Sequence, residues 1–263
     1  MDRVGVFVSW LMLTVVLVFL MAPIIVVIGV SVSPSTVFDF PPDGVSLRWY
    51  QRIMSLEGFW SATRLSAEIA LLATATSLVI GTLAAIAIVR GTFPGREALA
   101  TFLTSPLMLP GLVVGIALAR FFREFGLRDA FLSLLIAHLV VTMPFIVRTV
   151  LASLMLFDFA MLDAARTLGC SYPRALLKVL VPNLAPAFLS GGLFAFIISF
   201  DNYAVSIFLT DVRTKTLPIQ MLHYLGESPD PTLAAISTLQ IILTIVILIL
   251  GDRLVGLRRL ASI

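Results

Sequence analysis

The group most able to do chemistry in this sequence is a carboxylate within a long apolar stretch. Asp201 lies well inside the apolar run that begins near Leu184, and its neighbours are Phe200, Asn202 and Tyr203. An ionisable residue in a membrane-spanning segment is costly and usually faces the protein interior or a water path. Together these side chains offer a carboxylate, an amide and two rings, which can bind a cationic amine. A structural ion pair between Asp201 and a basic residue of another helix or subunit is the alternative.

The other residues that could act as catalysts or ligands are isolated from one another. His138 lies in the middle of a second apolar run, where a neutral histidine bonded to a neighbouring helix is the simplest interpretation. His223 has no catalytic partner near it in the sequence, and the single cysteine, Cys170, lies in no Cys/His cluster. The sequence contains no P-loop, no His-Glu-x-x-His and no Gly-x-Ser-x-Gly motif. We therefore expect no catalytic residue, no metal site and no ATP site in this chain.

The composition requires a membrane. Of the 263 residues, 59% are hydrophobic and 13% are charged, whereas a soluble domain averages about 25% charged residues. A membrane-spanning helix needs roughly 20 mostly apolar residues, so the chain has room for about six spans and little else. We predict an all-α membrane protein in which residues 1–263 form a single transmembrane domain.

Six runs free of charged residues predict the transmembrane helices. The first, from about Val4 to Val30, is too long for a cleaved signal peptide, whose apolar core has about 7–15 residues. The other five runs are Ile69–Val89, Ala98–Ala119, Ala130–Val147, Leu184 to about Leu209, and Thr232–Gly251. In the third run, Pro106 and Pro110 predict a break or kink. The glycines at 111 and 115 match the small-xxx-small pattern of close helix packing.

The distribution of Lys and Arg orients these spans. An even number of spans puts both termini on one side, and slightly more basic residues fall on that side than on the other. A cluster beside the last run supports the same orientation: Arg253, Arg258 and Arg259. We therefore place both termini and the long connection Arg148–Asn183 in the cytoplasm.

That connection is amphipathic rather than an unstructured tether. Its first half has apolar residues at helical spacing along one side: Met161, Leu162, Ala165 and Leu168. Gly169 suits the left-handed position that closes a helix, and Ser171 and Pro173 suit the first positions of the next one. A second apolar stripe follows: Leu176, Leu177 and Leu180. The pattern predicts a helix–turn–helix that rests on the bilayer or docks into a partner.

The spacing within this segment resembles the EAA loop of ABC-importer permeases. That motif reads Glu-Ala-Ala, three residues, Gly, nine residues, an aliphatic residue, one more residue, Leu and Pro. The matching residues here are Asp163, Ala164, Ala165, Gly169, Val179, Val181 and Pro182. Asp163 replaces the glutamate and Val181 replaces the leucine, while every spacing is kept. The stretches Pro106–Leu118, Ser199–Tyr203 and Arg213–Pro218 are similar to the same family, and to the second permease of spermidine/putrescine transporters in particular.

The resemblance implies the type I importer permease fold, with six transmembrane helices and a cytoplasmic helical coupling loop, here residues 152–183, between helices four and five. The residues that would couple to the ATPase are Asp163, Ala164, Ala165, Arg166, Gly169 and Pro182. The implied partners are a second homologous permease, two ATP-binding subunits that hold ATP and Mg, and a periplasmic solute-binding protein. The resemblance also implies that the chain lies in the lipid of a bacterial inner membrane. It implies no nucleic-acid partner and no cofactor bound by this chain.

A polyamine such as putrescine or spermidine is the expected solute, because the subgroup resemblance and the carboxylate of Asp201 both favour a cation. Opines, amino-acid-like compounds and phosphonates stay open, since related permeases serve varied solutes. An ion-driven secondary transporter or channel is the alternative from another class, but it needs no ATPase and leaves the cytoplasmic loop unexplained. A membrane-embedded enzyme would require a set of polar residues that the sequence lacks.

Overall fold

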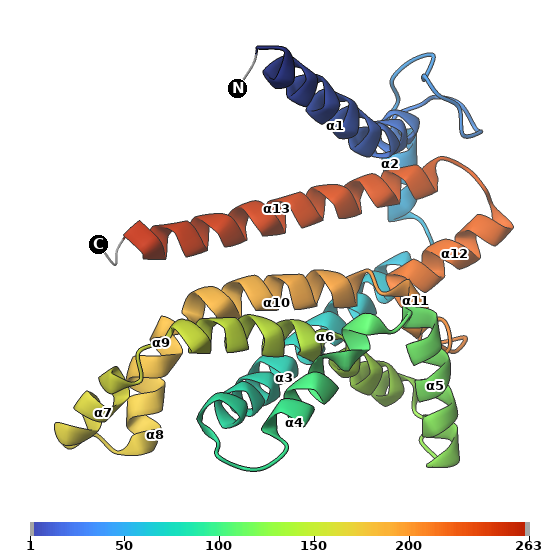
Figure 1. Ribbon diagram of the computed structural model, residues 1–263. Coiled ribbons are helices and arrows are strands. Elements are labelled where there is room, and N and C mark those ends of the chain that lie inside the picture. The colour runs from blue at the N-terminus through green and yellow to red at the C-terminus, as the bar shows by residue number, and fades with distance from the viewer. Residues whose placement is uncertain (1–2, 261–263) are drawn as a thin grey trace. The chain divides into compact units, whose positions relative to one another are not determined.

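The structure, a computed structural model, describes residues 3–260, with side chains for residues 6–253. Every regular element in that range is helical, which confirms the all-α prediction (Figure 1). Four helices are long and apolar enough to cross a membrane: α1 (Arg3–Ser31), α3 (Phe59–Arg90), α6 (Ala130–Leu156) and α13 (Thr232–Leu260). The chain is therefore a membrane protein, as its composition predicts.

Two further apolar segments are bent helix pairs. Arg96–Met108 meets Gly111–Glu124 at a bend of 111°, and Tyr172–Asn183 meets Ala185–Phe200 at a bend of 68°. If each bent pair is one span, the described chain has up to six spans, in agreement with the prediction.

The first of these bends lies where the two prolines of the third run predict it. Helix α4 (Arg96–Thr104) continues into the short 3-10 helix η1 (Ser105–Met108), which has Pro106 in its first turn. The next residue is extended, and Pro110 stands at the N-cap of α5 (Gly111–Glu124). Proline is tolerated at a helix start but not in its interior, so the chain ends one helix and begins another here.

Two helices are longer than the charge-free runs. Helix α6 continues beyond Val147, past the exposed Arg148, to Leu156, and α3 begins at Phe59 rather than Ile69. A long charged side chain can lie along a helix and keep its head group in water, so a charge does not end a helix. The first residues of the predicted loop 152–183 therefore belong to α6.

The helices form two compact units, and each is described by itself. The first contains the chain up to Phe59 together with Met221–Ile245. In it, the indole N–H of Trp49, on α2 (Arg48–Met54), donates to the Ser33 carbonyl at 2.8 Å. Arg52 Nη1 lies 3.4 Å from Asp230 Oδ2. These contacts hold the chain between α1 and α3 in a defined structure.

The second unit contains Trp60–Gln220 together with the chain from Val246 onward. Helix α10 (Ala185–Phe200) runs beside α6 and packs against it (Figure 1). One buried apolar cluster joins α3, α6, α10 and the segment between α6 and α10: Ala85, Ile146, Val150, Leu154, Leu162, Ala175, Leu180, Leu184 and Ala195. The predicted cytoplasmic loop is therefore packed into the core rather than attached beside it.

Close packing also explains the small-xxx-small pattern in α5. A Cβ on Gly115 would lie 2.8 Å from Cδ2 of Phe208 and 3.0 Å from the carbonyl oxygen of Ala204. A Cβ on Gly111 would lie 3.0 Å from Cβ of Ala204. The two glycines thus let α5 approach α11 (Tyr203–Ser206) closely. The sequence pattern predicts close packing of this segment but does not identify the helix it packs against.

We predict that Gly115→Ala destabilises the protein, because the new methyl group collides with Phe208 and with backbone. Overpacking of this kind costs about 1–3 kcal/mol. Gly226→Ala is the matched control, since a Cβ there meets nothing within 4 Å. Thermal unfolding in detergent should show a lower midpoint for Gly115→Ala and an unchanged or higher one for Gly226→Ala. Equal midpoints would contradict the close approach of α5 and α11.

Candidate functional site

The predicted first helix of the segment 152–183 is α7 (Ala160–Thr167). Asp158 precedes the N-cap residue Phe159, and its Oδ1 accepts the N–H of Ala160 at 2.9 Å. Gly169 has a φ of 88°, as predicted for a left-handed closing residue. The Gly169 N–H donates to the Arg166 carbonyl at 2.9 Å, and the Cys170 N–H donates to the Ala165 carbonyl at 3.1 Å. This pair of bonds is a Schellman motif, so Gly169 fixes where α7 ends.

Helix α7 packs against the core through only a few of its side chains. Leu162 is fully buried and Ala165 is half-buried against the core, whereas Asp163, Ala164 and Arg166 are exposed. The predicted stripe is wrong for its other two members, since Met161 is exposed and Leu168 is 89% exposed. An eight-residue helix is too short to bury a stripe along its whole length. A partner therefore has most of the helix surface available, including small residues that permit close approach.

The second half of the segment contains a π-helix that the sequence analysis missed. It consists of α8 (Tyr172–Ala175), the π-helix η2 (Leu176–Leu180) and α9 (Val181–Asn183). Pro182 accounts for the wide turn, because proline has no N–H to donate and its ring clashes with the carbonyl four residues earlier. Beside it, the Asn183 side chain donates to the Val179 carbonyl at 2.7 Å. Pro182 was the available signal for this irregularity.

The details of the second half differ from the prediction in two respects. Ser171 is at the N-cap of α8 and Pro173 is in its first turn, as expected, but the Ser171 side chain accepts no capping bond. Leu180 is buried and Leu176 is half-buried, but Leu177 is exposed. The π turn changes which side chains share a face, so the 3.6-residue period fails there.

An aromatic cluster links this segment to the end of α3. The guanidinium of Arg90 lies 5.0 Å from the ring centre of Phe159 and 6.0 Å from that of Tyr172. Arg166 lies 5.9 Å from the same Tyr172 ring. Cation–π contacts of this kind tie α7 and α8 to α3. Displacement of α7 would therefore be felt by α3 as well as by α6.

The second predicted site, around Asp201, is a break between two helices. Helix α10 ends at Phe200, and α11 begins at Tyr203, where Asn202 Oδ1 accepts the Val205 N–H at 3.0 Å as an N-cap. Asp201 and Tyr203 are exposed, and Asp201 forms no ion pair with any side chain of residues 6–253. Phe200 is only 8% exposed and stacks on Phe196 with ring centres 5.8 Å apart. The structure therefore presents the carboxylate and the tyrosine ring outward, and uses the other two residues to build the break.

His138 holds this break in place. The buried His138 ring on α6 lies with Nδ1 2.7 Å from Ser199 Oγ and Nε2 3.0 Å from Ser206 Oγ. Because the Ser206 hydroxyl donates to the Asn202 carbonyl at 2.5 Å, it accepts from Nε2–H. Nδ1 then accepts from Ser199. The predicted bonding of His138 to neighbouring helices is confirmed, and its bonds reach both sides of the break.

The hydrogen bonds of His138 to Ser199 and Ser206, which we call the clamp, extend into α3. Thr142 donates to the His138 carbonyl at 2.8 Å, and its hydroxyl lies 2.7 Å from Ser77 Oγ on α3. No pattern in the sequence distinguishes these hydroxyls, since single serines and threonines in apolar runs are common. Only their convergence across α3, α6, α10 and α11 identifies them as one network.

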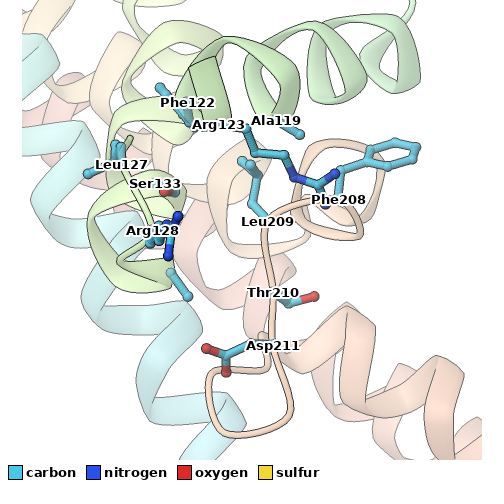
Figure 2. A pocket seen from close by; sticks show the side chains of 11 residues that line it. Ala119, Phe122, Arg123, Leu127, Arg128, Ser133, Phe208, Leu209, Thr210 and Asp211 are labelled. Carbon is cyan, nitrogen blue, oxygen red and sulfur yellow. The ribbon is translucent and has the colours of Figure 1, made fainter. Parts of the chain in front are cut away.

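A cavity of about 520 Å³ lies beyond the C-terminal end of α5 (Figure 2). It is lined by the end of α5, the connection to α6, the first turn of α6 and the chain after α11: Ala119, Phe122, Arg123, Leu127, Arg128, Ala130, Ser133, Phe208, Leu209, Thr210 and Asp211. Asp211 Oδ1 accepts the N–H groups of Thr214 at 2.7 Å and of Arg213 at 2.8 Å. These hydrogen bonds hold the pKa of Asp211 below its ordinary value, so the group stays a carboxylate whose Oδ1 faces its own turn. None of these residues was singled out from the sequence as a binding residue.

Residues 77–258 match the family described as binding-protein-dependent transport system inner membrane component. The chain belongs to this family. The permease is 32% identical to the spermidine/putrescine transport system permease protein PotC of Haemophilus influenzae over 238 residues, which are 90% of this chain and 92% of that protein. It is 27% identical to the putrescine transport system permease protein PotI of Escherichia coli, over 84% of this chain and 81% of that protein.

Solved structures show the same fold. A chain of a bacterial ABC transporter involved in the import of the acidic polysaccharide alginate has a TM-score of 0.73 to the permease, with 19% identity and 96% of each chain covered. The family resemblance read from the loop is thus confirmed. The protein is a permease subunit and not an enzyme, and it works in an ABC transporter complex with an ATPase and a binding protein.

We predict that His138→Leu lowers the stability of the permease, because Ser199 and Ser206 would lose their buried partner. Each unsatisfied buried group costs about 1–3 kcal/mol. His138→Gln keeps one donor and one acceptor and should be milder. The measurement is the midpoint of thermal unfolding in detergent, with the exposed His223→Leu as control. A His138→Leu variant as stable as that control would show that the clamp contributes nothing.

Proposed function

We propose that this permease forms half of the pore of an ATP-driven importer for a small cationic solute, a polyamine such as putrescine or spermidine. The outward-facing carboxylate of Asp201 at the break between α10 and α11 carries the proposal for the solute. The named substrates of the 32% identical relative agree with it. An opine, an amino-acid-like compound or a phosphonate is the alternative solute. The alginate importer has the same fold, so the fold alone does not select the solute.

The proposed assembly contains a second homologous permease, two ATP-binding subunits that hold ATP and Mg²⁺, and a periplasmic solute-binding protein. The permease lies in the bacterial inner membrane, with both termini and the segment α7–α9 in the cytoplasm. The 27 residues of α6 span about 40 Å, and the hydrocarbon core is about 30 Å thick, which supports opposite sides for the two ends of α6. The terminal residues, and the side chains of Arg258 and Arg259 that favour this orientation, lie outside the described residues.

Coupling in this proposal runs through α7. The ATPase subunits close on ATP and move the exposed face formed by Asp163, Ala164 and Arg166. Leu162 lies in the same buried cluster as Val150 and Leu154 of α6, so α7 cannot move without displacing α6. ATP thereby favours the outward-open state, and hydrolysis restores the inward-open one, because a ligand shifts an equilibrium only by binding one state more tightly.

The path for the solute passes the break at Asp201. A break exposes polar groups that a continuous apolar helix would hide. The carboxylate can neutralise one ammonium group, and the exposed Tyr203 ring can contact an alkyl chain or a cation. Because His138 fixes both sides of the break, the carboxylate keeps its position when the solute is absent.

An ion-driven transporter is the competing mechanism. It predicts solute uptake into vesicles that contain the permease without ATPase subunits, driven by an ion gradient. The proposal predicts uptake only when the ATPase subunits, ATP and the binding protein are all present. Gradient-driven uptake by the permease alone would reject the proposal.

We predict that Asp163→Lys reduces ATP-driven uptake at least tenfold, because a basic residue replaces the exposed acidic one on the docking face. A partner salt bridge converted to a like-charge pair costs several kcal/mol. Asp163→Glu, which introduces the usual residue of the motif, should retain uptake. Uptake and co-purification of the ATPase are measured together, so that lost docking and lost expression are told apart. Normal uptake by Asp163→Lys would remove this residue from the coupling role.

We predict that Asp201→Asn raises the KM for a diamine about 10- to 100-fold, since a charge-assisted hydrogen bond is worth about 1.5–3 kcal/mol. Assembly and basal ATPase activity should not change. Glu97→Gln, which removes an exposed carboxylate from the first turn of α4, is the control. An unchanged KM would exclude Asp201 from the solute path.

A further inference from the structure

We infer that the cavity at the end of α5 receives an acidic side chain of the solute-binding protein, whose carboxylate binds Arg123 and Arg128. The inference rests on the proposed function, because it requires a binding protein as partner. It adds the place and the chemistry of one contact between the two proteins.

The cavity lies at the end of the permease where a binding protein would dock. It is built around the start of α6, and the segment α7–α9 follows the other end of the same helix. Since α6 is about 40 Å long and longer than the hydrocarbon core, the two ends reach opposite faces of the membrane. A cavity at the first end is therefore on the face away from the ATPase subunits.

The lining of the cavity contains two arginines and one carboxylate, Asp211, which gives it a formal charge of +1. No carboxylate of residues 6–253 forms an ion pair with either arginine. Glu124 Oε1 lies 3.3 Å from Nε of Arg120, which does not line the cavity. Asp129 Oδ1 accepts the Leu132 N–H at 2.7 Å as the N-cap of α6. Asp211 lines the cavity, but its Oδ1 accepts two backbone N–H groups of its own turn.

The two cavity arginines are left without such partners. Arg123 and Arg128 are exposed, and neither forms an ion pair with a side chain of residues 6–253. Figure 2 shows Arg123 coming from α5 and Arg128 from the connection to α6, with Asp211 on the chain after α11. A guanidinium presents a planar set of donors that matches a carboxylate, so two unpaired arginines in one cavity favour an anionic group.

The size and lining of the cavity favour a protein side chain over the solute. A cationic polyamine would be repelled by the two arginines. The volume of about 520 Å³ exceeds what a single carboxylate fills, and the side chains of Phe122, Leu127 and Phe208 can pack against the stem of an aspartate or glutamate on a protruding loop. An acidic loop of the binding protein satisfies both the charge and the apolar walls.

The cavity also lies next to the elements that form the proposed solute path, so docking there could act on that path. Phe122 and Leu209 belong to a buried cluster with Val205 of α11 and Leu134 of α6, so the floor of the cavity is rigid. The lining residues Phe208 to Asp211 follow α11 directly. Docking would therefore act on the helix that begins at the Asp201 break.

The test uses the complete transporter in lipid nanodiscs with its purified, solute-loaded binding protein. ATPase activity is measured against binding-protein concentration for the unchanged complex and for the Arg123→Ala/Arg128→Ala double variant. The half-saturating concentration should rise about tenfold or more, with basal ATPase activity and the maximal rate retained, because interface charges act on the affinity of docking. Arg120→Ala is the matched control, since this arginine lies on the same helix, is paired with Glu124 and does not line the cavity.

The outcomes separate this inference from the proposed function. An unchanged half-saturating concentration, or an equal shift in Arg120→Ala, would overturn the inference while the proposed function stands. A shift that occurs only in nanodiscs with anionic phospholipid, and not in phosphatidylcholine, would assign the arginines to lipid head groups and overturn it too. If the binding protein does not stimulate the unchanged complex at all, the proposed function fails and the inference fails with it.

Discussion

A hydrocarbon bilayer offers no hydrogen-bonding partner to a polypeptide, so each backbone and side-chain polar group inside it must be satisfied by the protein itself. Continuous helices meet this requirement but give a solute no polar contact. The proposed solute path needs a break in a helix, and a break frees backbone groups. At Asp201 the freed groups are satisfied by the Asn202 cap and by the Ser206 hydroxyl, and His138 fixes that hydroxyl from α6. The buried hydrogen-bond network thus stabilises the break that exposes the Asp201 carboxylate.

The same requirement shapes the other breaks. At the bend between η1 and α5, Pro110 provides a helix start that has no N–H to satisfy, and the glycines that follow let α5 pack on α11. At Pro182 the chain widens into a π turn, and the Asn183 side chain donates to the Val179 carbonyl. Each irregularity has a local residue that explains it.

The proposed coupling depends on unequal exposure within one short helix. Leu162 is part of the core, whereas Asp163 and Ala164 are open to a partner. A helix that were buried on all sides could not dock, and one that lay on the surface without a buried anchor could not transmit a displacement. The contacts of Arg90 with Phe159 and Tyr172 extend the connection to α3. Packed interiors deform little, so displacement at α7 becomes displacement of whole helices.

The sequence by itself determined the membrane, the helical class, the break at Pro106 and Pro110, and the family, because these follow from local properties: apolar runs, prolines, and a motif of fixed spacing. It also determined that Gly169 ends α7, since a left-handed position favours glycine wherever it occurs. It did not determine the ends of α3 and α6, because a helix continues past a charge whose side chain can reach water. Only the tertiary structure decided that Leu162 rather than Leu168 anchors α7, that His138 joins Ser199 to Ser206, and that Arg123 and Arg128 share a cavity with the chain after α11. Those facts depend on which residues distant in the sequence meet, and no local pattern in the chain records that.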